Sequence, residues 1–453
     1  MIKGFREILF AAIRIDILDM NYIYSNSAIL QKLLSSDKTG LPRRGLLIRI
    51  IAFFGNGVRN IQFKSWVKQA KISKNSILFY SKSRNQKFSL EPLLDNLDSA
   101  IILGNHVEFS FSLTTFFAYL FSFPFFPLVL ISLLKSEGII REGFYYNFNL
   151  YWLTYGFYIS VRLWLKYIKP KVLVVGNDHI MEHRVMVKAA KDEGVPTIYI
   201  QHASVTSDFP PLAFDYALLE GNDALQIYNK IGKTNSIAFL IGNPKFDKYI
   251  NNINLSEKID SIGICANWLE PIDRIEELCS VLTAEFPTIN FYLRPHPQDK
   301  RIFLWEKIVE KYNIKLSQSN EEFIFDFLKI VDLIFAGNTN VHLEAALVNV
   351  YPIYYDFALN PKFESYSFVK TGLCEYISDP VSAGKRIKEL INNRPNIRIR
   401  TKHYCNTVNT LFDGHSSQLA SELIFQIAEG NEALLNNWSQ IKGFDLLAYG
   451  PIL

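Results

Sequence analysis

Short apolar runs that end abruptly in polar residues alternate with helical patterns along most of this chain. One series of such runs lies between residues 99 and 255, and a second begins near residue 256 and ends near residue 413. Strands that alternate with helices at this spacing are typical of βαβ units in a parallel sheet. The pattern therefore predicts two α/β domains, with strands at 99–103, 170–175, 196–200, 216–219, 237–241, 261–265, 290–294, 333–335 and 352–355.

The two ends of the chain lack this alternation. Residues 1–98 have mainly helical patterning, and residues 414–453 are also interpreted as helices. A chain of 453 residues is long enough for about two to three domains. We therefore expect a helical N-terminal region (1–98), two Rossmann-like domains (99–255 and 256–413), and C-terminal helices (414–453) that pack back on the N-terminal half.

Residues 109–134 form a strongly apolar segment that contains no charged side chain. A helix needs about 20 consecutive apolar residues to cross a bilayer, and this segment is long enough. Pro124, Pro127 and several Ser and Thr residues favour a buried or interfacial pair of helices over one spanning helix. The sequence leaves open whether the segment inserts in a membrane.

Basic residues are concentrated in one part of the chain. The formal net charge is only +4, yet residues 38–90 contain no Asp or Glu. Residues 41–54 mix basic side chains with an apolar run, which favours an anionic membrane surface over nucleic acid as the partner. The alternative is a solvated basic face that binds nothing. The basic residues of this block are Lys38, Arg43, Arg44, Arg49, Arg59, Lys64, Lys68, Lys71, Lys74, Lys82, Arg84 and Lys87.

The four cysteines are scattered and form no pattern typical of a disulfide framework or a structural zinc site. This usage fits a reducing compartment. Together with the basic block, it predicts a cytoplasmic protein that is peripheral on the inner face of the cell membrane.

A first polar segment with candidate chemistry is Arg294-Pro295-His296-Pro297, at the end of an expected strand. A guanidinium beside an imidazole is suited to bind phosphate oxygens, and the two prolines stiffen the turn. Ligands of open α/β sheets collect just beyond the carboxyl ends of the strands. The segment is therefore a candidate phosphate site, and the alternative is an ordinary loop histidine.

A second polar segment follows the expected strand 333–335. Asn338, Thr339 and Asn340 are suitable N-cap residues for a helix that begins near residue 341. A helix N-terminus offers free N–H groups to an anion, although an ordinary capped helix explains the same residues. Glu344 lies one turn further along and could accept hydrogen bonds from ribose hydroxyls, or could simply be solvated.

Five short motifs occur in a defined order along the chain. They are Gln201-His202, Gly242-Asn243-Pro244-Lys245-Phe246-Asp247, Arg294-Pro295-His296-Pro297, Asn338-Thr339 with Glu344-Ala345-Ala346, and Asp413-Gly414-His415-Ser416-Ser417. With these motifs the chain resembles bacterial surface-polysaccharide glycosyltransferases of the GT-B fold, over roughly residues 169–427. It is similar to capsule sialyltransferases and Kdo-transferases and to teichoic-acid glycerophosphotransferases.

The resemblance implies a GT-B-like α/β fold, with two Rossmann-like domains that face each other across a cleft. It implies that residues 256–413 bind the nucleotide donor and that residues 99–255, with the N-terminal region, face the acceptor. His296, with Arg294, would bind the donor phosphate, as would Thr339. The His-Pro segment and the residues around Thr339 give the full set of expected donor-binding residues: Arg294, His296, Pro297, Asn338, Thr339, Asn340 and Glu344.

An inverting transfer needs a general base from the acceptor side. The resemblance implies His202 for this role, but Ala203 replaces the glycine that follows the histidine in glycerophosphotransferases. Strand-end position adds Asp178, and we favour Asp178 or His202 as the catalytic residue. Other candidates for the cleft are His179, Asp223, Gly242 and Asn243.

No Asp-x-Asp pair occurs in the sequence, and we expect neither a metal nor a cofactor. The predicted function is transfer of a sugar from a CMP- or UDP-sugar to a growing capsule or lipopolysaccharide glycan, with a lipid-linked or oligosaccharide acceptor. One alternative is a glycerophosphate or phospho-alditol transferase. A second is a non-catalytic, membrane-bound scaffold of polysaccharide assembly. Nucleic acid is not an expected partner.

Overall fold

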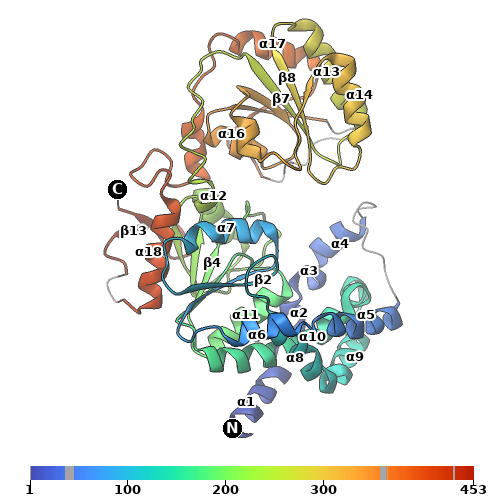
Figure 1. The fold of residues 1–453 in the computed structure, drawn as a ribbon, viewed down its shortest axis with the longest axis vertical. Helices are drawn as coiled ribbons and strands as arrows, with labels where there is room; N and C mark the ends of the chain where they lie inside the picture. The colour runs from blue at the N-terminus through green and yellow to red at the C-terminus, as the bar shows by residue number, and fades with distance from the viewer. Residues whose placement is uncertain (1, 36–44, 358–363, 365, 432–433, 453) are drawn as a thin grey trace.

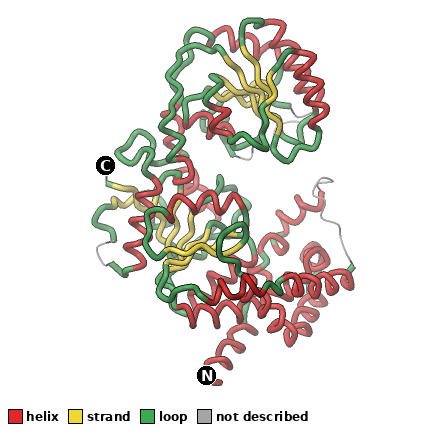
Figure 2. Tube along the Cα trace, viewed as in Figure 1, coloured by secondary structure: helices red, strands yellow, loops and turns green. Residues whose placement is uncertain are grey.

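The computed structural model describes residues 2–35, 45–357, 364, 366–431 and 434–452. It contains two sheets, each covered by helices, and these form two lobes (Figures 1 and 2). A group of helices extends the first lobe. The part of the basic block that includes Lys38, Arg43 and Arg44 lies outside the described residues.

The first lobe is built on an eight-stranded sheet in the order β13-β14-β6-β5-β4-β3-β1-β2. All neighbouring strands are parallel except the pair β13 and β14. The strands predicted for this lobe are present as β2 (Ala100–Gly104), β3 (Val172–Val175), β4 (Thr197–Ile200), β5 (Tyr216–Leu219) and β6 (Ile237–Leu240). Helix α7 (Arg84–Leu94) precedes β2, α11 (Met181–Asp192) follows β3 and α12 (Asn222–Ile231) follows β5, with the short turn η2 (Pro244–Phe246) after β6.

A strand near the N-terminal end of this lobe was not predicted. β1 (Ile77–Ser81) is fully buried between β2 and β3, so the interpretation of residues 1–98 as helical is wrong at this position. A five-residue apolar run is too short to distinguish a buried strand from a helix by periodicity. Pairing with β2 and β3 on both sides decides its conformation.

The end of the chain also joins the first lobe. Helix α18 (Ser416–Ala428) packs on the sheet beside α7, and Ser421 Oγ donates a hydrogen bond to the Leu93 carbonyl. The predicted helices beyond it are wrong in part, because β13 (Trp438–Ile441) and β14 (Ala448–Pro451) form an antiparallel hairpin. β14 pairs with β6 and so extends the sheet at its edge.

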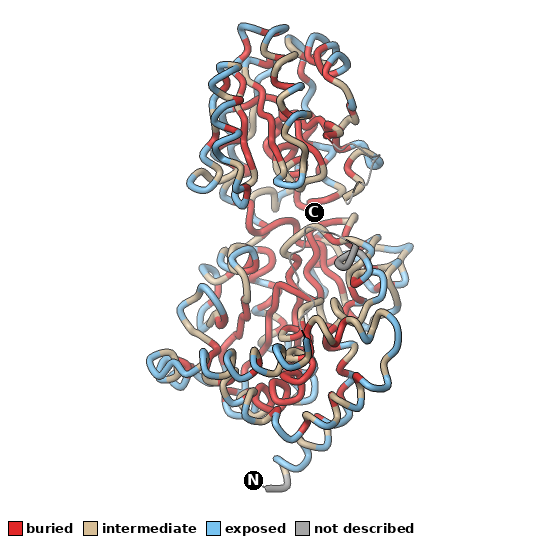
Figure 3. Tube along the Cα trace, turned by 90° about the vertical axis from the view of Figure 1, so that its right-hand side faces the viewer, coloured by how far each residue is buried: buried red, intermediate tan, exposed pale blue. Residues whose placement is uncertain are grey.

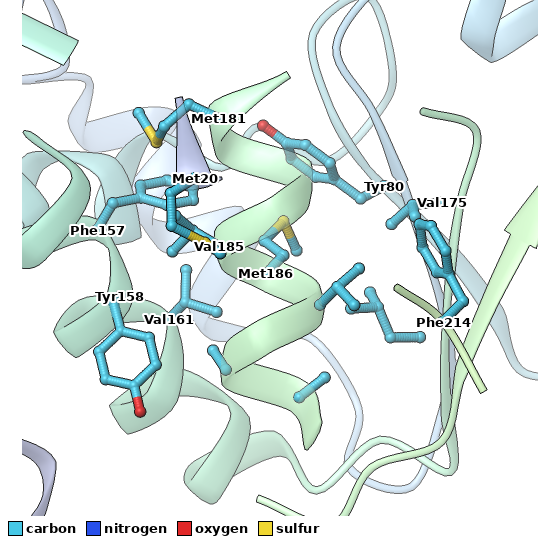
Figure 4. Close-up of a cluster of buried hydrophobic side chains, with 14 of the residues drawn as sticks. Met20, Tyr80, Phe157, Tyr158, Val161, Val175, Met181, Val185, Met186 and Phe214 are labelled. Atoms are coloured by element: carbon cyan, nitrogen blue, oxygen red, sulfur yellow. The ribbon is translucent and has the colours of Figure 1, made fainter. Parts of the chain in front are cut away.

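The helices that extend the first lobe pack around one long aromatic helix, α10 (Gly138–Ile168). Its inner face packs on α11 and on the sheet, where Phe157, Val161, Met186 and Val175 contribute to one apolar cluster (Figure 4). Aromatic side chains along α10 bury large areas, which anchors the extension to the lobe. The remaining helices of this region are α1 (Ile2–Ile13), α2 (Ile17–Met20), α3 (Tyr22–Ser25), α4 (Ser27–Ser35), α5 (Leu46–Arg59) and α6 (Phe63–Ala70).

The apolar segment 109–134 forms two helices, α8 (Ser112–Ser122) and α9 (Phe126–Lys135), joined by the turn η1 (Phe123–Phe125). By length and composition, Ser112–Lys135 is the one candidate for a membrane span in the described structure. Trp152 Nε1 of α10 donates to the Ser122 carbonyl (2.8 Å), and Ser160 Oγ donates to the Thr114 carbonyl (2.6 Å). These bonds tie α8 to the folded lobe.

The second lobe has a six-stranded parallel sheet in the order β12-β11-β10-β7-β8-β9. Its predicted strands are present as β7 (Ser261–Ala266), β8 (Asn290–Pro295), β10 (Leu333–Ala336) and β11 (Tyr351–Tyr355), and β9 (Lys315–Leu316) and β12 (Glu375–Ile377) form the edges. The helices are α13 (Ile272–Glu285), α14 (Ile302–Tyr312), α15 (Ile324–Leu328), α16 (Val341–Leu347) and α17 (Pro380–Leu390). Buried residues follow the strands of both lobes (Figure 3).

The chain passes between the lobes twice, after η2 and again between η3 (Arg398–His403) and α18. Asp247 fixes the second passage, because its carboxylate accepts hydrogen bonds from the Ser416 and Ser417 backbone N–H groups. Aromatic rings also connect the lobes, with Phe88 of α7 5.3 Å from Phe323. The strand ends of both sheets are therefore held near one another.

Candidate functional site

A cavity of about 600 Å³ lies between the two lobes. Its walls are the loops that follow β4, β7, β8 and β10, together with one face of α7. Because ligands of parallel sheets collect beyond the carboxyl ends of the strands, this cavity is the candidate site. The predicted site residues that line it are His202, Arg294, His296, Pro297, Asn338, Thr339, Asn340 and Glu344.

The loop that carries His202 is held by side chains on both sides of it. Gln201 Nε2 donates to the Ala203 carbonyl (3.1 Å), and Gln201 Oε1 accepts from the Glu220 N–H (2.9 Å). Lys245 Nζ donates to the His202 carbonyl (3.1 Å). The loop is thus fixed with alanine at position 203, where the resembling enzymes have glycine.

His202 is in a neutral state at physiological pH. Its pKa is lowered to about 4, first by burial and then by the nearby Lys245 ammonium. A neutral imidazole has a free lone pair, which a general base requires. His202 is thus the titratable side chain that the N-terminal lobe presents to the cavity in a basic form.

Lys245 lines the cavity but was not among the site residues predicted from the sequence, although it belongs to the motif at residues 242–247. It is only 8% exposed, and its Nζ lies 3.5 Å from Glu220 Oε1. Gly242, two residues after β6, has φ +77°, and a Cβ there would lie 2.1 Å from Thr407 Oγ1. Gly242 and the buried Asn243 do not line the cavity, and they shape the turn from which Lys245 reaches it.

Arg294, which we expected to bind phosphate, is hydrogen-bonded to other residues of the protein. Its guanidinium donates to Ser317 Oγ (2.6 Å), to Glu322 Oε2 (2.9 Å) and to the Glu322 carbonyl (2.8 Å). The side chain is 7% exposed, and Glu322 offsets its charge. Arg294 therefore holds the loop around Glu322 against the end of β8, much as Lys245 is buried beside Glu220.

His296 comes directly after β8 and is held by its own turn. Its Nδ1 accepts a hydrogen bond from the Gln298 N–H (3.1 Å), so in the neutral ring Nε2 carries the proton. Burial lowers the pKa of His296. Asp299 stiffens the turn, because its carboxylate binds Arg301 and accepts from Trp305 Nε1 (3.1 Å). The structure therefore presents a fixed N–H donor at the wall of the cavity.

The segment after β10 connects the two lobes across the cavity. Ser204 Oγ donates to Asn340 Oδ1 (2.7 Å), which ties the loop of His202 to the loop before α16. Of the three predicted capping residues, Asn340 occupies the N-cap position but makes no side-chain cap bond, whereas Thr339 Oγ1 accepts from the Val341 N–H (3.5 Å). Helix α16 is only seven residues long, which weakens the argument from its dipole.

Glu344 of α16 also lines the cavity. Burial raises the pKa of Glu344, while the Lys245 ammonium and the Arg294 guanidinium oppose this shift. Lys245 and Glu344 thus bring charges of both signs to the cavity, one from each lobe. A carboxylate beside cations can accept hydrogen bonds from hydroxyl groups of a ligand.

Asp178, His179 and Asp223 do not line the cavity. The Asp178 carboxylate points into the N-terminal lobe, where it accepts from Tyr228 Oη (2.6 Å) and contacts His179 Nδ1 (2.9 Å). Asp223 lies 3.6 Å from His403 Nε2. Strand-end position alone was therefore insufficient, because a side chain at a strand end can turn inward to a buried partner.

Two buried titratable groups support the loop between β10 and α16 from behind. His342 Nε2 bonds with the Gly337 carbonyl (2.8 Å), and burial lowers the pKa of His342 to about 4. Glu270 accepts from the Asn267 N–H (2.7 Å), and burial raises its pKa to about 8. A Cβ on Gly337 would lie 1.9 Å from Glu270 Oε1, so the loop needs glycine there.

We expect His342 to make stability depend on pH between about 6.5 and about 4. In that range the unfolded chain binds a proton that the folded chain does not, so stability falls as the pH falls. The contribution is about 3 kcal/mol for a fully buried imidazole. Thermal unfolding from pH 7 to pH 5 should show a smaller decrease for His342→Gln than for wild type. Glu270 makes stability change with pH in the opposite direction, and it does so in wild type and variant alike. Equal decreases of stability with falling pH in the two proteins would contradict the assignment to His342.

No group of three or more His, Cys, Asp or Glu side chains that could hold a metal ion occurs in the part of the chain that the structure describes. The four cysteines are buried, and burial raises the pKa of Cys265, at the edge of the cavity, to about 12. Cys265 is thus an unreactive thiol.

Comparisons with known proteins agree with this architecture. No protein-family model matches the sequence, and no curated protein matches it. The structure is similar to UDP-GlcNAc 2-epimerase from Neisseria meningitidis bound to UDP-GlcNAc, with a TM-score of 0.53, 13% identity, and coverage of 79% of this chain and 100% of that chain. The chain has the GT-B fold. The predicted fold of two Rossmann-like domains is confirmed.

Two further structures were found, of which only the first has a TM-score above 0.5. A crystal structure of UDP-N-acetylglucosamine 2-epimerase has a TM-score of 0.51, 14% identity, and coverage of 80% of this chain and 98% of that chain. The wall teichoic acid polymerase TagF has a TM-score of 0.48, 13% identity, and coverage of 88% and 100%. At such identities the likeness concerns the fold, and function has to be argued from the cavity.

Proposed function

We propose that this GT-B protein transfers a sugar from a nucleotide-activated donor to a growing capsule or lipopolysaccharide glycan. The observation that carries the proposal is that one cavity is lined by the neutral His202 from one lobe and by His296, Thr339 and Glu344 from the other. A base facing a phosphate-binding wall is what an inverting transfer needs. The acceptor is a lipid-linked or oligosaccharide hydroxyl group.

The donor would bind to the second lobe through its phosphate. The His296 Nε2–H donates to a phosphate oxygen, and the Thr339 hydroxyl adds a second donor. Lys245 lines the cavity from the other lobe and adds positive charge there, and its charge is partly offset by Glu220, as that of Arg294 is by Glu322. Glu344 accepts hydrogen bonds from the ribose hydroxyls.

In the transfer step the acceptor oxygen attacks the anomeric carbon while the bond from that carbon to the donor phosphate breaks. His202 takes the proton of the attacking hydroxyl and later releases it to solvent. The electrons of the breaking bond remain on the phosphate, whose added charge is stabilised by His296 and Lys245. Inversion at the anomeric carbon follows from attack opposite the leaving group.

Nucleotide binding tests the donor half of this proposal. We expect one of CMP, UDP, GDP and CDP to raise the unfolding temperature of the protein, since a ligand at 100 times its Kd stabilises by about 2.7 kcal/mol. His296→Ala and Lys245→Met should each weaken that nucleotide's binding about tenfold or more, because each removes a hydrogen bond or charge that faces phosphate. The measurement is a thermal-shift titration of each variant.

The matched control is Lys311→Met, which removes an exposed lysine paired with Glu276 outside the cavity. It should leave nucleotide binding unchanged. Absence of binding by all four nucleotides would contradict the proposal and favour a non-catalytic scaffold.

Product analysis distinguishes sugar transfer from the alternative of glycerophosphate transfer. A glycosidic product carries no phosphate from the donor, and the nucleotide leaves with its phosphate intact. A phosphodiester product would retain one donor phosphate, and this outcome would replace our assignment of the reaction while leaving the donor site in place.

A further inference from the structure

The extension of the first lobe exposes an unusual amount of apolar surface. About half of the large apolar side chains exposed in the described structure lie between residues 5 and 134, which is less than a third of the chain. Contiguous exposed apolar surface is uncommon on monomeric soluble proteins and marks interaction sites. The exposed side chains are Phe5, Phe10, Ile13, Leu47, Ile48, Ile51, Phe54, Val58, Ile61, Phe63, Val67, Phe117, Leu120, Phe123, Ile131 and Leu134.

Helix α5 shows the feature most clearly, because it is apolar on two sides. Its inner side chain Phe53 is buried and stacks on Trp152 of α10, with ring centroids 3.8 Å apart. Its outer stripe, at helical spacing, consists of Leu47, Ile51, Phe54 and Val58, each between 49% and 70% exposed. A surface helix of a soluble domain is expected to carry polar side chains on that side.

Exposed and half-buried aromatic side chains of different helices are in contact with one another. Phe54 of α5 lies 5.7 Å from Phe123 of η1, and Trp66 of α6 lies 4.9 Å from Phe116 of α8, measured between ring centroids. Phe5 of α1 lies 6.2 Å from Phe121 of α8. These helices lie at the end of the molecule away from the second lobe (Figure 1). We name the outward side chains of α1, α5, α6, α8, η1 and α9 the apolar-basic face.

The charge on α5 and α6 is of one sign. Arg59, Lys64 and Lys68 are exposed on these helices, Lys71 and Lys74 follow α6 directly, and residues 38–90 contain no acidic residue. Apolar and basic side chains together favour the interface of an anionic bilayer, where the apolar groups enter the headgroup boundary and the cations meet lipid phosphates. A second copy of the same face would bring like charges together.

We propose that the apolar-basic face docks on the surface of an anionic phospholipid bilayer, with α5 lying in the plane of the interface. Segment Ser112–Lys135 does not cross the bilayer in this arrangement. A turn with Pro124 divides it, and close packing of Gly156 on the Ala118 carbonyl ties its first half to α10. The cavity between the lobes then stays outside the lipid, on the same side of the membrane as the rest of the chain.

Vesicle flotation of the full chain tests this proposal. Wild type should bind vesicles that contain phosphatidylglycerol, bind phosphatidylcholine vesicles about tenfold less, and dissociate as salt rises from about 0.1 M to about 0.5 M. The variant Leu47→Ser/Ile51→Ser/Val58→Ser should lose binding about tenfold or more, because apolar area no longer enters the interface. All three side chains are at least 62% exposed, so the fold does not depend on them.

The matched control is Phe303→Ser/Ile330→Ser/Val381→Ser, which removes three exposed apolar side chains of the second lobe. It should bind vesicles like wild type. Equal loss in both variants, equal binding to neutral and anionic vesicles, or resistance of wild type to extraction at alkaline pH would overturn the proposal. So would a dimer in solution that the α5 variant dissociates, since the face would then serve a second copy. Because the test needs no nucleotide, its failure is distinguishable from failure of the proposed transfer.

Discussion

The variant His202→Asn is expected to reduce sugar transfer by about 10²- to 10⁴-fold, the usual contribution of a positioned general base. Nucleotide binding should remain within about twofold of wild type, because the His202 side chain is not among the groups proposed to hold the phosphate. Asparagine has a similar size and remains polar, so the loop held by Gln201 and Lys245 should persist. The measurements are a transfer rate at saturating donor and a nucleotide titration.

The pH dependence of the rate provides a second readout for the same residue. The pKa of His202 is about 4, so its basic form is complete near pH 7 and is lost only as the pH falls through about 4. The wild-type rate should therefore be nearly flat between pH 6 and 8 and fall in acid. His403→Asn is the matched control, since His403 lies beside Asp223 and does not line the cavity. A His202→Asn variant with the wild-type rate would show that another group takes the proton.

The variant Gly156→Ala is expected to destabilise the first lobe by about 2–4 kcal/mol or to prevent its folding. A Cβ at position 156 of α10 would lie 2.0 Å from the Ala118 carbonyl oxygen and 2.5 Å from the Ser122 backbone nitrogen of α8. Both atoms belong to helix backbone, so the two helices would have to separate. Chemical denaturation measures the loss directly.

Helix α5 contains the matched control for this substitution. A Cβ at Gly55 would meet nothing within 4 Å, so Gly55→Ala removes only the conformational freedom of glycine within a helix. It should stabilise the protein by up to about 1 kcal/mol. Equal effects of Gly55→Ala and Gly156→Ala would contradict the close packing of α8 on α10.

The second lobe was the part of the molecule most readable from sequence. Its central strands are continuous apolar runs that end in polar side chains, and these runs predicted that His296 and Thr339 follow strands at one sheet edge, with Glu344 in the helix that comes next. A parallel sheet forces this result, because all of its strands end on the same side. The cavity agrees with that expectation at each of these positions.

The first lobe was harder to read for two physical reasons. β1 is a short apolar run whose conformation depends on two strands that come later in the chain. Asp178 and His202 both follow strands, yet Asp178 turns to Tyr228 inside the lobe while His202 faces the cavity. Local sequence contains no information on which partner a strand-end side chain finds.

By itself, the sequence determined the alternation of strands and helices, the GT-B architecture it resembles, and the residues at the strand ends of the second lobe. These follow from local periodicity and chain order. Only the tertiary structure decided which groups share the cavity. The structure shows that Lys245 lines the cavity, that Arg294 is paired with Glu322, and that Ser204 is hydrogen-bonded to Asn340 across the two lobes. Such contacts join residues far apart in the chain, and their geometry is set by how the two sheets are packed.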